Sequence, residues 1–376
     1  AQFNVLFRPP LTARDTGATP LDDVPAPAVL TPLEASAGRQ CPPAPVPKAG
    51  SGEQAGSEPL RESARGIVVA GDTAHPAAGA LARALAEHLD WPLLAEPTSQ
   101  ARGGPQALTR YAELLETRSG RELAARADHL IVVGHPSLSR SVSALLGRDD
   151  VETTVLTERA RWTDVSGRAR RVIPIDGPGH FPVGEVASRA ALLAASLGLA
   201  RVGPGWSESW RQAVAELSEP AHPGGADAVA NAAVNAVWEA SLVPDAPVLL
   251  IGSSMTVRRF DRLARPASTA PLAVANRGLA GIDGTIATGV GMWLASGRPV
   301  RAVMGDLAFL HDAMSLGRGL REEEADLQVI VVDDDGGAIF SHLEHARTTA
   351  SGRFERLYTA PQCASISVLA AALGAR

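Results

Sequence analysis

Residues 305–340 of this 376-residue chain read GDLAFLHDAMSLGRGLREEEADLQVIVVDDDGGAIF. The apolar runs VRAVM (300–304) and LQVIVV (327–332) are typical of buried strands, and acidic residues and glycine follow each of them. Residues 308–318 predict a helix between them, so the two strands are expected to pair in parallel. Both acidic turns should then lie at the carboxyl edge of one sheet, where ligands bind in open α/β folds.

The residue types at these two turns favour a hard cation together with a phosphate group. Mg²⁺ prefers oxygen ligands and commonly binds one or two carboxylates plus phosphate oxygens of a ligand. Glycines allow backbone N–H groups to approach a diphosphate closely. The alternative interpretation of residues 333–337 is an acidic surface turn that ends a strand.

The spacing and four sequence blocks resemble a known enzyme family. After Asp306, 26 residues precede the acidic run, which resembles the thiamine diphosphate signature. The blocks are NRGLAGIDG (276–284), GDLAFLHD (305–312), DDDGGAIFSHL (333–343) and FERLY (354–358). In this order they resemble the MenD family, the 2-succinyl-5-enolpyruvyl-6-hydroxy-3-cyclohexene-1-carboxylate synthases of menaquinone biosynthesis.

The resemblance implies an α/β fold of two doubly wound, mainly parallel sheets with helices on both faces. One would be a central Rossmann-like domain and the other would bind the diphosphate of thiamine diphosphate. It also implies that Mg²⁺, or Mn²⁺, is held by Asp306, Asp334 and the backbone carbonyl of Gly336. The family usually has asparagine at or near position 334. Three aspartates here would repel one another and the diphosphate unless a divalent ion offsets their charge.

The cofactor and substrate residues are likewise implied by the resemblance. Thiamine diphosphate would contact Ile282, Gly305, Asp306, Leu307, Asp334, Gly336, Gly337, Ile339 and Phe340. Ile282 would support the cofactor in a V shape that brings its amino group beside the reactive carbon. As a bare pattern, such an isoleucine is more often part of a core.

The implied reaction is the decarboxylation of 2-oxoglutarate, followed by addition of the succinyl carbanion equivalent to isochorismate. Both substrates carry carboxylates, which arginine binds in a bidentate manner. Ser254 and Arg258 stand one helical turn apart after a strand, and Arg277 follows the next strand. We expect these three, with Ile282, to be the catalytic residues, while Arg259 should point elsewhere on the helix. Substrate binding is assigned to Ser254, Arg258, Arg277, Ile339, Phe340 and Leu343. Any one arginine could instead form a surface ion pair.

The chain divides into four parts by composition and pattern. Residues 1–12 resemble the end of an N-terminal pyrimidine-binding domain, or else form an ordinary first strand. Residues 13–63 are rich in proline, alanine and glycine and predict a flexible linker. Residues 64–200 alternate strands and helices and predict the central Rossmann-like domain. Residues 201–222 are expected to connect it to the diphosphate-binding domain (205–376), which ends early.

The overall composition narrows the function further. The formal net charge of −6 disfavours a nucleic-acid or anionic-membrane surface. No apolar run is long enough to span a bilayer, and the two cysteines form no metal or disulfide pattern. A cytoplasmic enzyme is expected.

Two alternatives to a MenD-type transferase remain. One is another thiamine diphosphate enzyme, of the acetolactate synthase or 2-oxoacid decarboxylase type. The other is a catalytically inactive relative that binds the cofactor. Family members use a glutamate of the N-terminal domain, usually from a second subunit, so we expect a homodimer or homotetramer. We also expect the fragment alone to be inactive.

Overall fold

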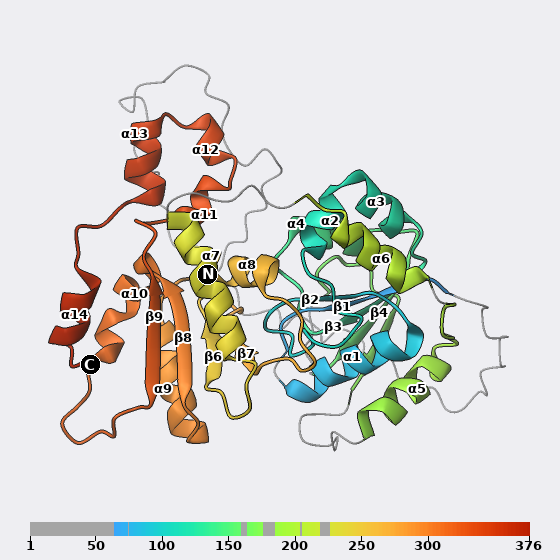
Figure 1. Cartoon of the computed structure of the whole chain (residues 1–376), viewed down its shortest axis with the longest axis horizontal. Helices are drawn as coiled ribbons and strands as arrows, with labels where there is room; N and C mark the ends of the chain where they lie inside the picture. Colours follow the sequence, from blue (N-terminus) through green and yellow to red (C-terminus); the bar gives the residue numbers. More distant parts are fainter. Residues whose placement is uncertain (1–63, 74, 159–163, 176–184, 204, 219–225) are drawn as a thin grey trace, which may run out of the picture.

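The computed structural model describes residues 64–73, 75–158, 164–175, 185–203, 205–218 and 226–376 (Figure 1). The predictions for residues 1–12 and 13–63 therefore lie outside the described residues. Within the described ranges the chain builds two parallel sheets side by side, each covered by helices. This arrangement confirms the predicted α/β class.

The first sheet has the strand order β2-β1-β3-β4-β5, and every neighbouring pair is parallel. Its central strands are apolar on both faces, as expected for strands with helices on both sides. All five residues of β1 and all five of β3 are buried. The strands are β1 (Gly66–Ala70), β2 (Leu93–Ala95), β3 (His129–Val133), β4 (Glu152–Thr157) and β5 (Arg171–Pro174).

Six helices accompany this sheet: α1 (Pro76–Leu89), α2 (Tyr111–Glu116), α3 (Arg118–Ala125), α4 (Arg140–Leu146), α5 (Val186–Ser196) and α6 (Trp206–Ala215). The last was not expected, because its residues were assigned to a connection. In the structure, Trp206 and Trp210 are buried in the core of the first sheet, and the indole N–H of Trp206 donates to the Gly66 carbonyl at 2.8 Å. Two large apolar side chains one turn apart stabilise α6 against this core.

The second sheet has the order β7-β6-β8-β9 and is also fully parallel. Its strands are β6 (Val248–Ile251), β7 (Ala273–Val274), β8 (Val300–Gly305) and β9 (Leu327–Val332). The longer helices are α7 (Ala226–Ala240), α8 (Met255–Leu263), α9 (Thr285–Ser296), α10 (Asp306–Asp312) and α14 (Ile366–Ala372). Short helical segments are η3 (Ala313–Leu316), α11 (Ala338–Ser341), α12 (His345–Thr348), α13 (Ser351–Phe354) and η4 (Glu355–Thr359).

Buried polar side chains join the two halves. The guanidinium of Arg102, which is fully buried, donates to the carbonyls of Ala264 and Asp261 and pairs with the Asp261 carboxylate. The Tyr111 hydroxyl donates to the same carboxylate. These contacts lie between α2 and the loop after β2 on one side and α8 on the other. They hold the ends of the two sheets close together.

Candidate functional site

The two acidic turns meet at the carboxyl edge of the second sheet. β8 and β9 pair in register from Val300 and Leu327 to Gly305 and Val332, so Asp306 and Asp333 follow adjacent strand ends. The Asp306 carboxylate, through Oδ2, accepts a hydrogen bond from the Gly336 backbone N–H at 2.7 Å. The loop after β9 is therefore joined directly to the first residue of α10, as a shared binding site requires.

Asp306 is buried, with only 4% of its surface exposed. Its second oxygen, Oδ1, has no hydrogen-bond partner among the described residues. Burial raises the pKa of this carboxyl, and repulsion by Asp334 and Asp333 raises it further, while the N–H groups of Leu307 and Gly336 lower it. A buried carboxylate oxygen without a partner is energetically unfavourable unless a cation or a proton satisfies it.

Asp334 has a cationic partner that the sequence did not predict. The Arg259 guanidinium donates to Asp334 Oδ2 at 2.7 Å and to Asp227 Oδ1 at 2.6 Å. The expectation that Arg259 points elsewhere on its helix is therefore wrong. α8 directs this side chain toward the acidic turn.

The glycines of the turn allow close backbone packing. Gly336 has φ +114°, and a Cβ there would lie 2.1 Å from the Thr359 carbonyl oxygen. The Gly337 N–H donates to the same carbonyl at 2.6 Å, while the Gly336 carbonyl accepts from the Ala338 N–H at 2.9 Å. The end of η4, which contains most of the FERLY block, thus covers the DDDGG turn.

The residues present fit a divalent cation and a diphosphate. Asp306 offers a buried oxygen without a protein partner, and Asp334 and Gly336 line the same cavity. Carboxylate and carbonyl oxygens are the ligands that Mg²⁺ prefers. The described residues contain no cluster of three or more His, Cys, Asp and Glu side chains. Two carboxylates and a carbonyl do not require such a cluster.

Two arginines lie at the other end of the cavity. Arg258 donates to the carbonyl of Ser254, the residue that precedes α8, at 2.9 Å. Arg277 donates to Ser137 Oγ at 2.7 Å, and its buried Nε has no partner in the part of the chain that is described. Burial lowers the pKa of Arg258, and the nearby charge of Arg277 lowers it further. Two cations this close favour an anionic ligand between them.

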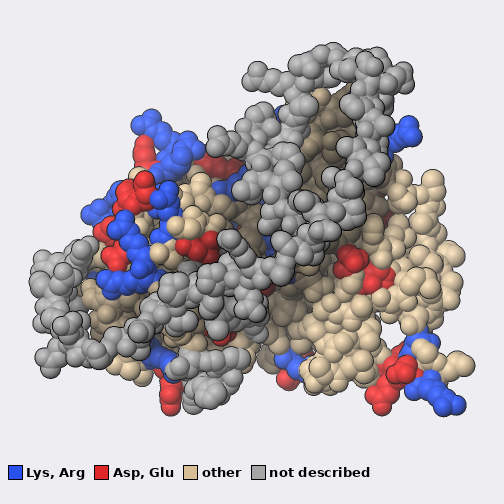
Figure 2. Space-filling view, turned by 180° about the vertical axis from the view of Figure 1, so that it is seen from behind, with Lys and Arg blue, Asp and Glu red and all other residues tan. Residues whose placement is uncertain are grey.

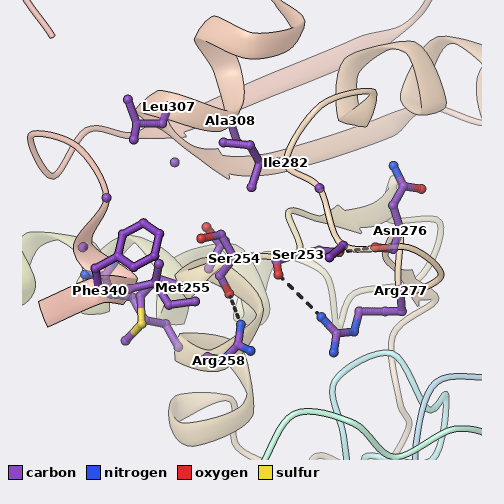
Figure 3. Close-up of a pocket in the computed structure, with 18 of the residues that line it drawn as sticks. Ser253, Ser254, Met255, Arg258, Asn276, Arg277, Ile282, Leu307, Ala308 and Phe340 are labelled. Atoms are coloured by element: carbon purple, nitrogen blue, oxygen red, sulfur yellow. Dashed lines mark hydrogen bonds between the residues drawn. The ribbon is translucent and has the colours of Figure 1, made fainter. Parts of the chain in front are cut away.

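A single cavity of about 520 Å³ contains both ends of this site. In Figure 3, Ile282 and Ala308 lie on one side of the opening, and Ser254, Met255 and Phe340 lie on the other. A volume of this size suits a cofactor or a drug-sized ligand. Every site residue predicted from the sequence lines it: Ser254, Arg258, Arg277, Ile282, Gly305, Asp306, Leu307, Asp334, Gly336, Gly337, Ile339, Phe340 and Leu343.

Several other lining residues were not predicted as site residues. Ser137 comes from the first sheet, and Ser253, Asn276 and Arg259 come from the second. The Ser253 hydroxyl donates to the Asn276 carbonyl at 2.5 Å, which joins the turns after β6 and β7. Ser253 and Asn276 stand beside predicted site residues in the sequence, which is a usable signal. Ser137 has no comparable signal, because it comes from a strand end in the other half of the chain.

The surface agrees with the composition. Basic and acidic side chains occur in small mixed groups over the face shown in Figure 2, consistent with the net charge of −6. None of the helices in the described ranges combines the length and the apolar character needed to cross a bilayer.

Comparison with known proteins gives relatives of one kind. The chain is 40% identical over 328 residues to a 2-succinyl-5-enolpyruvyl-6-hydroxy-3-cyclohexene-1-carboxylate synthase of Kineococcus radiotolerans, which covers 84% of this chain and 54% of that protein. Synthases of the same name from Paenarthrobacter aurescens and Myxococcus xanthus are 37% and 34% identical over 99% and 100% of the chain, and 60% and 62% of their own lengths. The chain thus spans a little over half of these relatives. No family model matches it.

Proposed function

Because the chain is homologous over most of its length to the MenD family, we propose that its protein is a 2-succinyl-5-enolpyruvyl-6-hydroxy-3-cyclohexene-1-carboxylate synthase. Such a protein decarboxylates 2-oxoglutarate and adds the succinyl unit to isochorismate. One observation supports this above the others. A single cavity carries a carboxylate and glycine turn at one end and two arginines at the other. This arrangement suits a metal-bound diphosphate beside a carboxylated substrate.

The proposed roles follow from the contacts. Asp306, Asp334 and the Gly336 carbonyl would hold Mg²⁺ or Mn²⁺, and the diphosphate of thiamine diphosphate would lie against the glycines. When bound, this cofactor supplies the stabilisation of the carbanion equivalent. The chain supplies orientation and charge around it.

The arginines would bind substrate carboxylates. Arg258 and Arg277 present guanidinium groups to the cavity, and their mutual repulsion is relieved when an anion binds between them. Ser254 would add a hydroxyl to the same end. Ile282, Phe340 and Leu343 would exclude water, which strengthens each polar contact around the reacting atoms.

We further propose that the protein acts in the cytoplasm as a homodimer or homotetramer. Leu279 lies in the cavity loop and is 94% exposed, which is unusual for a leucine beside a binding site. A second chain covering this loop would explain the exposure. Light scattering of the purified full-length protein tests the oligomeric state.

The reaction is tested on the full-length protein that contains this chain. Incubation with 2-oxoglutarate, isochorismate, thiamine diphosphate and Mg²⁺ should yield the succinylated product by mass spectrometry. Arg277→Ala should mainly raise KM for a carboxylated substrate. Acetolactate or acetoin formed from pyruvate would instead identify another thiamine diphosphate enzyme and overturn the proposal.

One observation favours a second candidate, a relative that has lost cofactor chemistry. Asp334, a proposed metal ligand, already shares one oxygen with Arg259. Calorimetry with Mg²⁺ and thiamine diphosphate separates the two. Binding that depends on Asp306 supports the enzyme, whereas absence of binding supports the inactive relative.

A further inference from the structure

Glu96 lies at the carboxyl end of β2, in the first sheet, and its backbone is held on both sides. Its N–H donates to the Ala70 carbonyl at 2.8 Å, and its own carbonyl accepts from the Ser99 N–H at 3.1 Å. Only 3% of the residue is exposed. The side chain therefore leaves a rigid backbone and points into a buried space between the two sheets.

The Glu96 carboxyl binds a turn that follows β3. Its Oε1 accepts from the Ser137 N–H at 2.6 Å and from the Leu138 N–H at 2.8 Å. These are two consecutive backbone donors in the loop between β3 and α4. Loop donors in a buried position need an acceptor, and one carboxyl oxygen satisfies both of them.

The same turn holds Arg277 on its other side. Arg277 Nη2 donates to Ser137 Oγ at 2.7 Å and approaches the Ser137 carbonyl at 3.4 Å. Nη1 approaches the Ser253 carbonyl at 3.5 Å, a longer contact. Ser137 thus supplies the shortest hydrogen bond that the structure gives to this guanidinium. The order of contacts is Glu96, then Ser137, then Arg277, then the cavity.

The charged groups around Glu96 show which property of the side chain matters. Asp261 from α8, Arg277 and Arg258 interact with it electrostatically, as does Tyr111 from α2. Burial raises the pKa of the Glu96 carboxyl to about 8, Asp261 raises it further, and the two turn N–H groups and Arg277 lower it. The carboxyl is then mostly protonated at neutral pH. A neutral acceptor still orders the turn, so hydrogen bonding rather than charge is its contribution.

We propose that Glu96 is a positioning residue that sets the guanidinium of Arg277 in the cavity through the 137–138 turn. The inference rests on the proposed function, in which Arg277 binds a substrate carboxylate. It adds that the first sheet, through a residue outside the cavity, determines affinity for that substrate. A guanidinium displaced by even one ångström loses bidentate geometry.

The first experiment needs no substrate. Hydrogen exchange of the Ser137 and Leu138 amides is measured in the wild type, Glu96→Ala and Glu96→Gln. Loss of the acceptor should speed exchange roughly tenfold in the alanine variant, since a net hydrogen bond has about that effect. The glutamine variant keeps the acceptor oxygen and should retain protection. Equal protection in all three proteins would overturn the proposal.

The second experiment follows Arg277 itself. Phenylglyoxal modification, mapped by peptide mass spectrometry, should reach Arg277 faster in Glu96→Ala and in Ser137→Ala than in the wild type. Glu96→Gln should react as the wild type does. If only Ser137→Ala changes the reactivity, Glu96 does not set this arginine and the proposal fails.

The third experiment uses turnover by the full-length protein. Glu96→Ala should raise KM for one carboxylated substrate several-fold with a smaller change in kcat, and Glu96→Gln should restore it. The double variant with Ser137→Ala should be no worse than the weaker single variant, because the two act on one contact. A wild type without turnover overturns the proposed function, and the exchange and modification data then decide on Glu96. An active wild type with unchanged KM in Glu96→Ala overturns this inference alone.

Discussion

Arg259 and Asp334 form an ion pair of 2.7 Å in which both side chains are nearly buried, with 3% and 8% of their surfaces exposed. The arginine also pairs with Asp227, which is 53% exposed. The acidic turn therefore does not carry the repulsion of three free aspartates. α8 supplies a fixed positive charge beside the position where a divalent ion is proposed.

Replacing Arg259 by methionine should destabilise the chain by about 3 kcal/mol, because removal of one partner leaves a buried charge uncompensated. The double variant Arg259→Met with Asp334→Asn should recover much of this loss, since the uncompensated charge is removed as well. Urea unfolding of the single and double variants measures both values. Arg262→Met is a matched control on the exposed side of the same helix and should change stability little. Additive losses in the double variant would contradict a direct ion pair.

Replacing Asp306 by asparagine should separate stability from metal binding. The buried carboxylate has a raised pKa because burial disfavours its charge, so the neutral amide should stabilise the metal-free chain by about 1 kcal/mol at neutral pH. The same change should abolish the heat of binding of Mg²⁺ and thiamine diphosphate in calorimetry. Asp326→Asn, an exposed position just before β9, should leave both quantities unchanged. Normal binding by Asp306→Asn would exclude this carboxylate as a ligand.

The sequence was sufficient to predict the contact between the two acidic turns. Strands at 300–304 and 327–332 with a helix between them pair in parallel, so Asp306 and Gly336 had to lie at one edge. The resemblance to a known family then added Ser254, Arg258 and Arg277, which also line the cavity. Their individual roles remain predictions.

Three features could not be predicted in the same way. The direction of Arg259 depends on how α8 packs against the sheet, which helical spacing alone does not determine. Glu96 and Ser137 reach Arg277 only because two separate sheets pack end to end. The helix α6 was missed because flanking proline and glycine suggested a connection. Trp206 and Trp210, one turn apart, were the signal for it.

Replacing Gly336 by alanine should disrupt the acidic turn. The residue has φ +114°, and an added Cβ would lie 2.1 Å from the Thr359 carbonyl oxygen. Strain and displacement together should cost about 2 kcal/mol or more in the free energy of unfolding. Gly278→Ala is a matched control, because that Cβ would meet no atom within 4 Å. Thermal unfolding compares the two, and equal midpoints would show that η4 moves aside without cost.

The stability of the chain should depend on pH through Glu96. Its pKa is raised from 4.5 to about 8 in the folded state by burial, so the folded protein binds a proton that the unfolded chain releases. The stabilisation is therefore complete below about pH 4.5 and is lost as the pH rises through about 8. Glu96→Gln cannot titrate and should show a flatter profile in urea unfolding between about pH 5 and 9. Asp261, whose pKa burial also raises, titrates with the same sign in both proteins. Parallel profiles for the two proteins would mean that Glu96 is ionised throughout this range and that its buried environment does not retain the proton.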